Sequence, residues 1–261
     1  GGIKAPVIMS GRARRYNKAL SGTCGRIRMV CGMYGKRSIR IGKAMKTAAV
    51  LTAALLLCGA AVMSDRLSAK AAGEMEDSRK IAITFDDGPH PYYTEQLLDG
   101  LKERGVKATF FVTGMHAEQY PELICRMSDE GHLIGNHTYS HTQLSSSNSE
   151  TFKEELIQTN EVIEELTGQE VQYVRPPYGT WDKKFEKELN MFPVLWTVDP
   201  LDWCSDNVAR IVQNVMSKAD ENDIILMHDE YKSTVTAALQ IIDELMEQGY
   251  EFVTVDELLF D

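Results

Sequence analysis

Cysteine is scarce in the part of this chain that can build a core. Three of the five cysteines, Cys24, Cys31 and Cys58, fall in an N-terminal stretch of unusual composition, and only Cys125 and Cys204 follow it. Two thiols cannot form the disulfide framework of a small secreted domain, and a domain of about 190 residues can bury a core without one. We therefore expect structural roles for both, with Cys125 a small apolar residue within a helix.

Acidic residues are absent from the first 46 positions, which carry twelve Lys or Arg. The rest of the chain carries the remaining sixteen basic residues and all 38 acidic ones, a formal net charge of −22. A protein that neutralises nucleic-acid phosphates needs a basic face, so the acidic part argues against nucleic-acid binding. Such asymmetry indicates a targeting or processing segment ahead of a folded domain.

A hydrophobic run long enough to span a membrane is also missing. Residues 48–62 are apolar over fifteen positions, whereas a transmembrane helix needs about twenty, so the run is typical of a signal peptide. Small residues near Ala71 would permit cleavage there. We predict a basic extension without a fold of its own (1–44), a signal peptide or uncleaved N-terminal anchor (45–72), and one globular domain (73–261). The protein is then expected to be secreted or in the cell wall, with membrane attachment only through an uncut segment.

Seven short, apolar, β-branched runs alternate with amphipathic segments after residue 79. Runs that are hydrophobic on both faces are typical of buried parallel strands, and strict alternation indicates a single α/β domain. The domain is short for an eight-fold barrel, so an open or irregular barrel is expected. The predicted strands are 81–85, 108–113, 132–135, 172–174, 194–198, 224–227 and 252–255. The predicted helices are 94–104, 121–130, 149–167, 181–189, 206–219 and 234–248.

Two motifs carry residue types that bind metals. Asp86 and Asp87 are adjacent in TFDDGP (84–89), at the end of the first run. Neighbouring carboxylates are unfavourable unless a cation shares them, although this sequence could also be a simple strand-end turn. His137 and His141 are four residues apart in HTYSH after the third run, and imidazoles at that spacing can face one point. With one carboxylate they would leave open positions for water and substrate.

Polar residues also follow three later runs. In RPPYG (175–179), Tyr178 has the first backbone N–H after Arg175, and a stiffly held N–H suits an oxyanion; a rigid loop with a structural Arg–carboxylate pair fits equally well. His228 ends the sixth run, and Asp199 could orient it and stabilise its protonated form. Trp203 offers a face on which a sugar ring can stack, although core packing is the commoner role of Trp.

All five motifs lie at the C-terminal ends of predicted strands. Parallel α/β folds build their sites on that face, whereas unrelated surface features would scatter over both faces. The arrangement therefore predicts one site.

Together the motifs resemble those of the NodB-homology polysaccharide deacetylases, carbohydrate esterase family 4. The resemblance covers roughly residues 80–259, and its five motifs, in family order, are TFDDGP, HTYSH, RPPYG, DPLDW (199–203) and LMH (226–228). Five ordered motifs are far more specific than a single short pattern. The resemblance implies a distorted seven-stranded β/α barrel of TIM-barrel type, which hydrolyses N-acetyl, sometimes O-acetyl, groups on a polysaccharide.

The resemblance also implies a metal centre. Asp87, His137 and His141 correspond to the ligands of one divalent metal, usually Zn²⁺, with Co²⁺, Ni²⁺ or Mn²⁺ as alternatives. Asp86 corresponds to the general base that activates water, and Arg175 to the residue that orients it.

The remaining motif positions correspond to the groups that meet the substrate. The Tyr178 N–H would stabilise the oxyanion, and His228, tuned by Asp199, would protonate the leaving amine. Leu226 and Trp203 would line the pocket for the acetyl methyl group.

We therefore expect a hydrolase that acts on carbon–nitrogen bonds other than peptide bonds and removes N-acetyl groups from cell-wall glycan. The leading expected substrate is N-acetylglucosamine of peptidoglycan. An acetylxylan-type esterase and a deacetylase of chitooligosaccharide or exopolysaccharide are the alternatives, followed by a glycan-binding domain that keeps only the fold. The expected partner is an acetylated glycan. No protein or nucleic-acid partner is expected, and the chain is expected to be a monomer.

Overall fold

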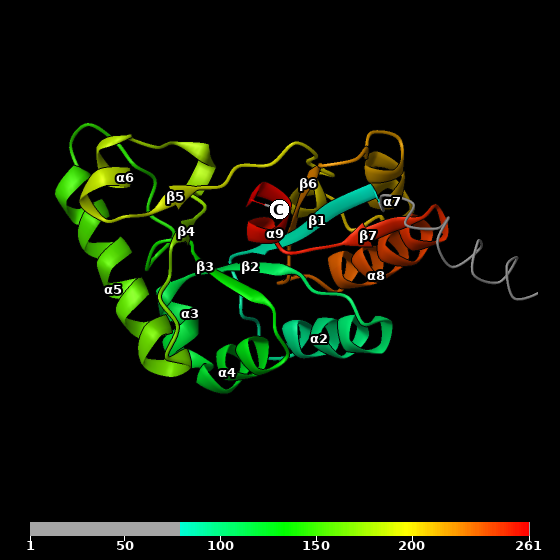
Figure 1. Ribbon diagram of the computed structural model, residues 1–261, viewed down its shortest axis with the longest axis horizontal. Helices are drawn as coiled ribbons and strands as arrows, with labels where there is room; N and C mark the ends of the chain where they lie inside the picture. Colours follow the sequence, from blue (N-terminus) through cyan, green and yellow to red (C-terminus); the bar gives the residue numbers. More distant parts are fainter. Residues whose placement is uncertain (1–78, 261) are drawn as a thin grey trace, which may run out of the picture. The chain divides into compact units, whose positions relative to one another are not determined.

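The computed structural model describes residues 79–260 (Figure 1). The predicted basic extension (1–44) and signal segment (45–72) lie outside the described residues. Within residues 79–260, no helix combines the length and the apolar character that crossing a membrane requires.

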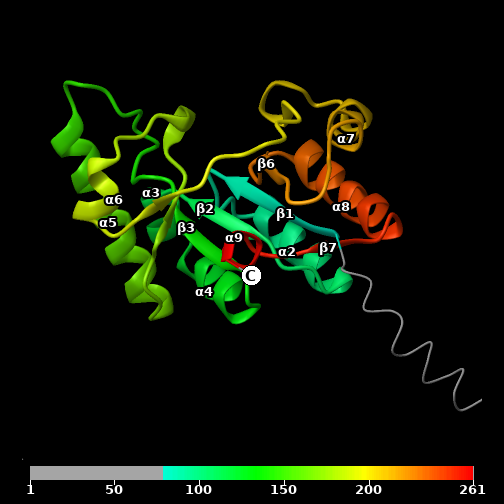
Figure 2. The same ribbon diagram turned by 45° about the horizontal axis from the view of Figure 1, so that its top comes forward.

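A curled sheet of parallel strands forms the centre of the domain (Figure 2). Every ladder between the described strands is parallel, as predicted. The strands lie in the order β5 (Phe192–Pro193), β4 (Tyr173–Val174), β3 (Leu133–Asn136), β2 (Thr109–Val112), β1 (Arg79–Asp86) and β6 (Ile224–His228), and β7 (Tyr250–Phe252) pairs with the first residues of β1.

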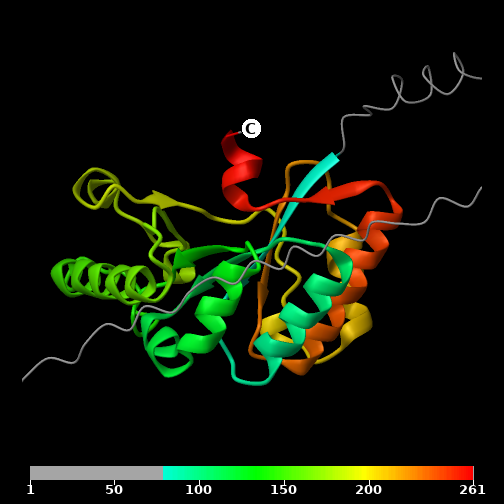
Figure 3. The ribbon, with the colours of Figure 1, turned by 60° about the horizontal axis from the view of Figure 1, so that its bottom comes forward.

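The longer helices pack against one face of this sheet (Figure 3). The six predicted helices are present, and Gly105 and Gly168 end two of them in the left-handed conformation, with φ of 66° and 70°. The longer helices are α2 (Tyr93–Arg104), α4 (Pro121–Asp129), α5 (Ser149–Thr167), α7 (Val208–Met216) and α8 (Lys232–Glu247). The short ones are α3 (Gly114–Gln119), α6 (Lys184–Glu188), α9 (Val255–Phe260) and the 3₁₀ turns η1 (Pro177–Gly179) and η2 (Asp202–Cys204).

Strand β1 shows how the sheet separates its two faces. Side chains alternate along a strand, so Ile81, Ile83 and Phe85 point together into the core beneath the helices. Thr84 and Asp86 therefore share the opposite, inner face. Both are buried and both contact the side chain of Arg175. Alternation thus carries Asp86 to the inner edge of the sheet.

Helix α9 covers the inner face at the end where the strands begin. Its Val255 packs with Ala82 and Phe111 in a small apolar cluster. The predicted strand 252–255 was misplaced: β7 ends at Phe252 because the next residues start this helix. The Thr254 N–H donates to Glu257 Oε2 at 3.0 Å, which is one half of a capping box. A Thr followed three residues later by a Glu is the sequence pattern of that motif.

The predicted strand 194–198 is divided between two neighbours. The Val194 N–H donates to Val174 O of β4 at 2.8 Å, whereas Val198 bridges to Ile225 of β6. Between these points the carbonyls of Val194 and Leu195 accept N–H groups of Arg175 at 3.1 and 3.2 Å. A side chain thus takes the acceptors that a partner strand would use, and the regular strand is confined to residues 192–193.

Candidate active site

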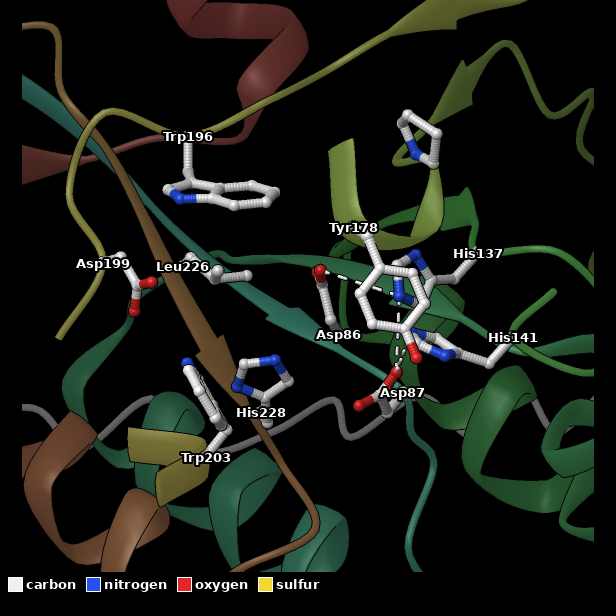
Figure 4. A pocket seen from close by; sticks show the side chains of 11 residues that line it. Asp86, Asp87, His137, His141, Tyr178, Trp196, Asp199, Trp203, Leu226 and His228 are labelled. Carbon is white, nitrogen blue, oxygen red and sulfur yellow. Dashed lines mark ion pairs between the residues drawn. The ribbon is translucent and has the colours of Figure 1, made fainter. Parts of the chain in front are cut away.

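A pocket of about 400 Å³ opens at the C-terminal ends of the strands (Figure 4). It brings together all the predicted site residues except Arg175, which lies buried beside it. Pro176 and Trp196 also line it and were not predicted. The lining residues are Asp86, Asp87, His137, His141, Pro176, Tyr178, Trp196, Asp199, Trp203, Leu226 and His228.

Asp87, His137 and His141 converge on one point at one side of the pocket. Asp87 Oδ1 lies 3.3 Å from His137 Nε2 and 3.4 Å from His141 Nε2. One potential ligand atom from each residue lies within 4.8 Å of the others. The φ angles of Asp87 and His141 are 75° and 57°, a conformation that non-glycine residues seldom adopt and that is often associated with functional sites. These residues form a candidate metal-binding triad.

The donor atoms of the triad fit a divalent cation. Asp87 Oδ1 is buried, and no hydrogen-bond partner reaches it from within residues 79–260. His137 Nδ1 lies 2.6 Å from the carbonyl of Arg175, so Nδ1 carries the proton and the lone pair of Nε2 faces Asp87. Burial acts to raise the pKa of Asp87, but its interaction with His137, helped by the charges of His228 and His141, holds it at about 2. An ionised carboxylate whose Oδ1 receives no hydrogen bond from the described part of the chain, and which faces two imidazoles, is the environment that a cation completes.

Asp86 is held by the buried guanidinium of Arg175. Arg175 Nη1 donates to Asp86 Oδ1 at 2.8 Å and to Thr84 Oγ1 at 2.6 Å, and its Cζ lies 4.2 Å from the centre of the Phe111 ring. Arg175 is fully buried. The other carboxylate oxygen, Asp86 Oδ2, lies 3.8 Å from His137 Nε2 and is the one beside the triad. Arg175 therefore forms the Arg–carboxylate pair that the sequence allowed, and its carboxylate partner, Asp86, lines the pocket.

His228 lies beside Asp86 because their strands are in register. Its predicted partner was Asp199, and this is corrected: His228 Nδ1 lies 3.0 Å from Asp202 Oδ1, whereas Asp199 accepts the Leu201 N–H at 2.8 Å. Asp202 is buried, and its Oδ2 accepts the His228 N–H at 2.9 Å. Burial lowers the pKa of His228, but the hydrogen bond and charge of Asp202, with Asp86 and Asp87, raise it to about 9.

Aromatic side chains form the walls of the pocket. Tyr178 and Trp203 are 66% and 55% exposed, so their faces are free to meet a ligand, whereas Leu226 is buried. The Tyr178 ring meets His141 edge to face, with centroids 5.1 Å apart. Its backbone has a φ of 58°, and no acceptor for its N–H is found within residues 79–260. Trp196 was not predicted as a site residue because it lies within residues 194–198, which were interpreted as a buried strand.

Known sequences match this chain over the described domain. The family profile described as polysaccharide deacetylase matches residues 73–194. Peptidoglycan-N-acetylmuramic acid deacetylase PdaC of Bacillus subtilis is 41% identical over 182 residues, which cover 70% of this chain and 39% of that protein. A peptidoglycan-N-acetylglucosamine deacetylase of Bacillus cereus is 38% identical over 186 residues, covering 69% of this chain and 68% of that protein. The chain therefore spans well under half the length of PdaC.

Solved structures match the fold as well. The structure of PdaC from Bacillus subtilis superposes with a TM-score of 0.66 at 41% identity, covering 69% of this chain and 90% of that one. A pseudoenzyme of carbohydrate esterase family 4 from Bacillus anthracis superposes with a TM-score of 0.65 at 31% identity, covering 70% and 66%. The likeness thus includes one protein described as a deacetylase and one described as a pseudoenzyme.

Proposed function

Since this chain belongs to the polysaccharide deacetylase family, we propose that it is a metal-dependent hydrolase that removes N-acetyl groups from cell-wall glycan. The observation that carries the proposal is the buried Asp87 Oδ1, which faces two imidazoles and receives no hydrogen bond from within residues 79–260. The names of the relatives, peptidoglycan N-acetylglucosamine and N-acetylmuramic acid deacetylases, favour peptidoglycan, and we take N-acetylglucosamine as the first substrate to test.

Asp87, His137 and His141 would hold the metal, and one oxygen and two nitrogen donors favour Zn²⁺, with Co²⁺, Ni²⁺ or Mn²⁺ as alternatives. When bound, the ion would act as a Lewis acid toward the acetyl carbonyl and lower the pKa of the attacking water.

Asp86 is proposed as the general base. Arg175 occupies Asp86 Oδ1, so Oδ2, on the side of the triad, is free to take a proton from water. Arg175 also keeps the carboxylate in one orientation, because its guanidinium is fixed by Thr84 and by the carbonyls of Val194 and Leu195.

His228 is proposed as the general acid. Asp202 engages Nδ1, so Nε2 is the atom that can deliver a proton to the leaving amine. The raised pKa of His228 favours the protonated form needed for that step. The N–H of Tyr178, held on a turn that begins with two prolines, would donate to the oxyanion, and Trp203 and Leu226 would contact the sugar and its acetyl methyl. Asp199 lines the same pocket as a further polar contact.

The finer features of the fold and location belong to the same proposal. Residues 192–198 reach from β4 to β6, which supports a distorted seven-stranded barrel of TIM type. We also propose that the chain divides into the segments 1–44, 45–72 and 73–261, and that segment 45–72 directs export. The protein would then act at the cell wall, as a monomer. The cell-wall names of the relatives support action at the cell wall, and the change from basic to acidic composition near residue 46 supports a separate segment ahead of the domain.

Acetate release from four substrates tests the proposal: peptidoglycan, chitooligosaccharide, acetylated exopolysaccharide and acetylated xylan. The expected result is acetate from peptidoglycan together with an equal number of new amines. Asp86→Asn should keep the metal and lose turnover. Acetate from xylan without new amines would identify an esterase instead.

The similarity to a pseudoenzyme favours one second candidate, a glycan-binding domain without catalysis. The presence of triad, base and acid in one pocket argues against it. Purified protein that binds glycan but releases no acetate from any substrate after metal loading would establish it.

A further inference from the structure

The loop that carries His141 connects β3 to α5, and it makes contacts with both α3 and α5. Its first half is tied to α3 by backbone hydrogen bonds: Gly114 N–H to Thr138 O and Met115 N–H to Tyr139 O, both at 3.0 Å. Gly114 permits this approach, because a Cβ there would lie 2.4 Å from the Tyr139 ring. The first half of the loop is therefore held by main chain and packing.

The second half of the loop is held by a carboxylate from α5. Glu155 Oε2 accepts the Ser140 N–H at 3.0 Å, and Oε1 accepts Ser140 Oγ–H at 2.8 Å and Thr142 Oγ1–H at 2.6 Å. These contacts flank His141 on both sides in the sequence. Burial acts to raise the pKa of Glu155, but hydrogen bonds from Thr142, Ser140 and Thr138 outweigh burial and lower the pKa below its usual value.

The backbone of this loop is in an unfavourable conformation that needs such contacts. Thr138 and His141 have φ of 63° and 57°, and Thr is β-branched. Left-handed conformations of non-glycine residues cost free energy and persist when surrounding contacts impose them. At Thr138 those contacts include Asn136 Oδ1, which accepts its N–H at 2.8 Å. At His141 they come from its neighbours Ser140 and Thr142, which Glu155 binds, and from the Thr142 N–H, which donates to Thr138 Oγ1 at 3.0 Å.

We propose that Glu155 is a positioning residue that holds His141 in its ligand geometry by binding the backbone and hydroxyl groups on either side of it. This inference rests on the metal centre of the proposed function. Glu155 does not reach the pocket. It acts through the loop, as outer partners of metal ligands do when they fix a ligand's orientation.

The two histidines of the triad are anchored by different contacts. His137 is anchored independently of Glu155, because its N–H donates to Val112 O at 2.9 Å and its Nδ1 meets the Arg175 carbonyl. Loss of Glu155 should therefore free His141 and leave Asp87 and His137 in place. The protein would keep a metal site with one ligand fewer, rather than lose the site entirely.

Metal affinity is the measurement that separates positioning from general stability. The full chain, stripped of metal, is titrated with Zn²⁺ against a chromophoric chelator, and the Co²⁺ form is examined by absorption spectroscopy. The variants are Glu155→Ala and Glu155→Gln, with the exposed neighbour Glu154→Ala as the matched control. Thr142→Val and Thr142→Ser remove and retain one hydroxyl contact of Glu155.

The expected result for Glu155→Ala is a Zn²⁺ dissociation constant raised roughly 10- to 100-fold, the range for outer partners of metal ligands. Its Co²⁺ spectrum should change as a nitrogen ligand is replaced. Glu155→Gln should fall between it and wild type, because its amide oxygen can still accept the Ser140 N–H, but its N–H₂ can only donate to the two hydroxyls and the negative charge is lost. Thr142→Val should weaken binding, whereas Thr142→Ser and Glu154→Ala should match wild type.

Affinity within twofold of wild type for Glu155→Ala, with only a lower melting temperature of the metal-free protein, would overturn the inference and leave the metal centre intact. Wild-type protein that binds no Zn²⁺ would instead overturn the metal centre and the inference with it. If Glu155→Ala does not fold, the Thr142 pair decides, and equal affinities of Thr142→Val and Thr142→Ser overturn the inference.

Discussion

Arg175→Met is predicted to be one of the most destabilising single substitutions in the domain. Arg175 is fully buried, and its guanidinium donates to Asp86, to Thr84 and to the carbonyls of Val194 and Leu195. Methionine fills similar space but donates nothing. Asp86, itself 3% exposed, would then be a buried carboxylate without its guanidinium partner.

Breaking a buried ion pair by removing one partner typically costs 3–5 kcal/mol, so the free energy of unfolding should fall by about 4 kcal/mol. The matched control is Arg104→Met, because Arg104 binds Asp243 through two contacts of 2.7 and 2.8 Å, as short as those of Arg175. The Asp243 side chain is 51% exposed, so the control should lose no more than about 1 kcal/mol. The two ion pairs have similar distances and differ in burial, so the difference between the two losses measures the effect of burial.

Urea unfolding at pH 7 measures both variants, with metal removed so that binding does not contribute. The double variant Asp86→Asn, Arg175→Met should recover part of the loss, because it also removes the unpaired charge. Equal losses for Arg175→Met and Arg104→Met, or no recovery in the double variant, would show that the buried charge is not the source of the effect.

Two further predictions concern pH. Burial lowers the pKa of His132 from 6.5 to about 4, so its neutral form stabilises the fold above pH 6.5, and this stability is lost as pH falls toward 4; about 2 kcal/mol should disappear between pH 7.5 and 5. Urea unfolding of His132→Gln should show a shallower pH dependence over that range, and a slope equal to wild type would contradict the assignment. Asp202→Asn should move the alkaline limit of deacetylation to lower pH, because burial lowers the pKa of His228 and Asp202 is the main group that raises it to about 9. An unchanged alkaline limb in the profile of kcat against pH would remove Asp202 from the proton transfer.

The fold was predictable where periodicity and strand composition agree. The α/β class, the parallel sheet and the six predicted helices followed from apolar runs and amphipathic segments, and the 149–167 helix was predicted at its observed limits. The errors fall where tertiary contacts replace the local pattern. Arg175 occupies the acceptors of residues 194 and 195, and Thr254 caps a helix where a strand was expected.

The candidate site was predictable as a set of residue types, but not in its pairings. Motif spacing brought Asp87, His137 and His141 together correctly as a candidate metal-binding triad. The partner of His228 was misassigned, because Asp199 and Asp202 are three residues apart and the intervening Leu201 has a φ of 61°. This left-handed residue reverses the chain and turns Asp202 toward His228. Leucine has no preference for the left-handed conformation, so the sequence does not predict the turn. Glu155 was missed because its role depends on helix α5 lying beside the HTYSH loop.

The central claim is that a metal held by Asp87, His137 and His141 is required for removal of acetyl groups from glycan. It is tested most directly by measuring bound zinc and acetate release from peptidoglycan on the same samples of wild type and Asp87→Ala. We predict one zinc per wild-type chain and acetate release that stops on chelation and returns in proportion to the zinc restored, with both lost in Asp87→Ala. Acetate release that persists in metal-free protein, or in Asp87→Ala, would contradict the account.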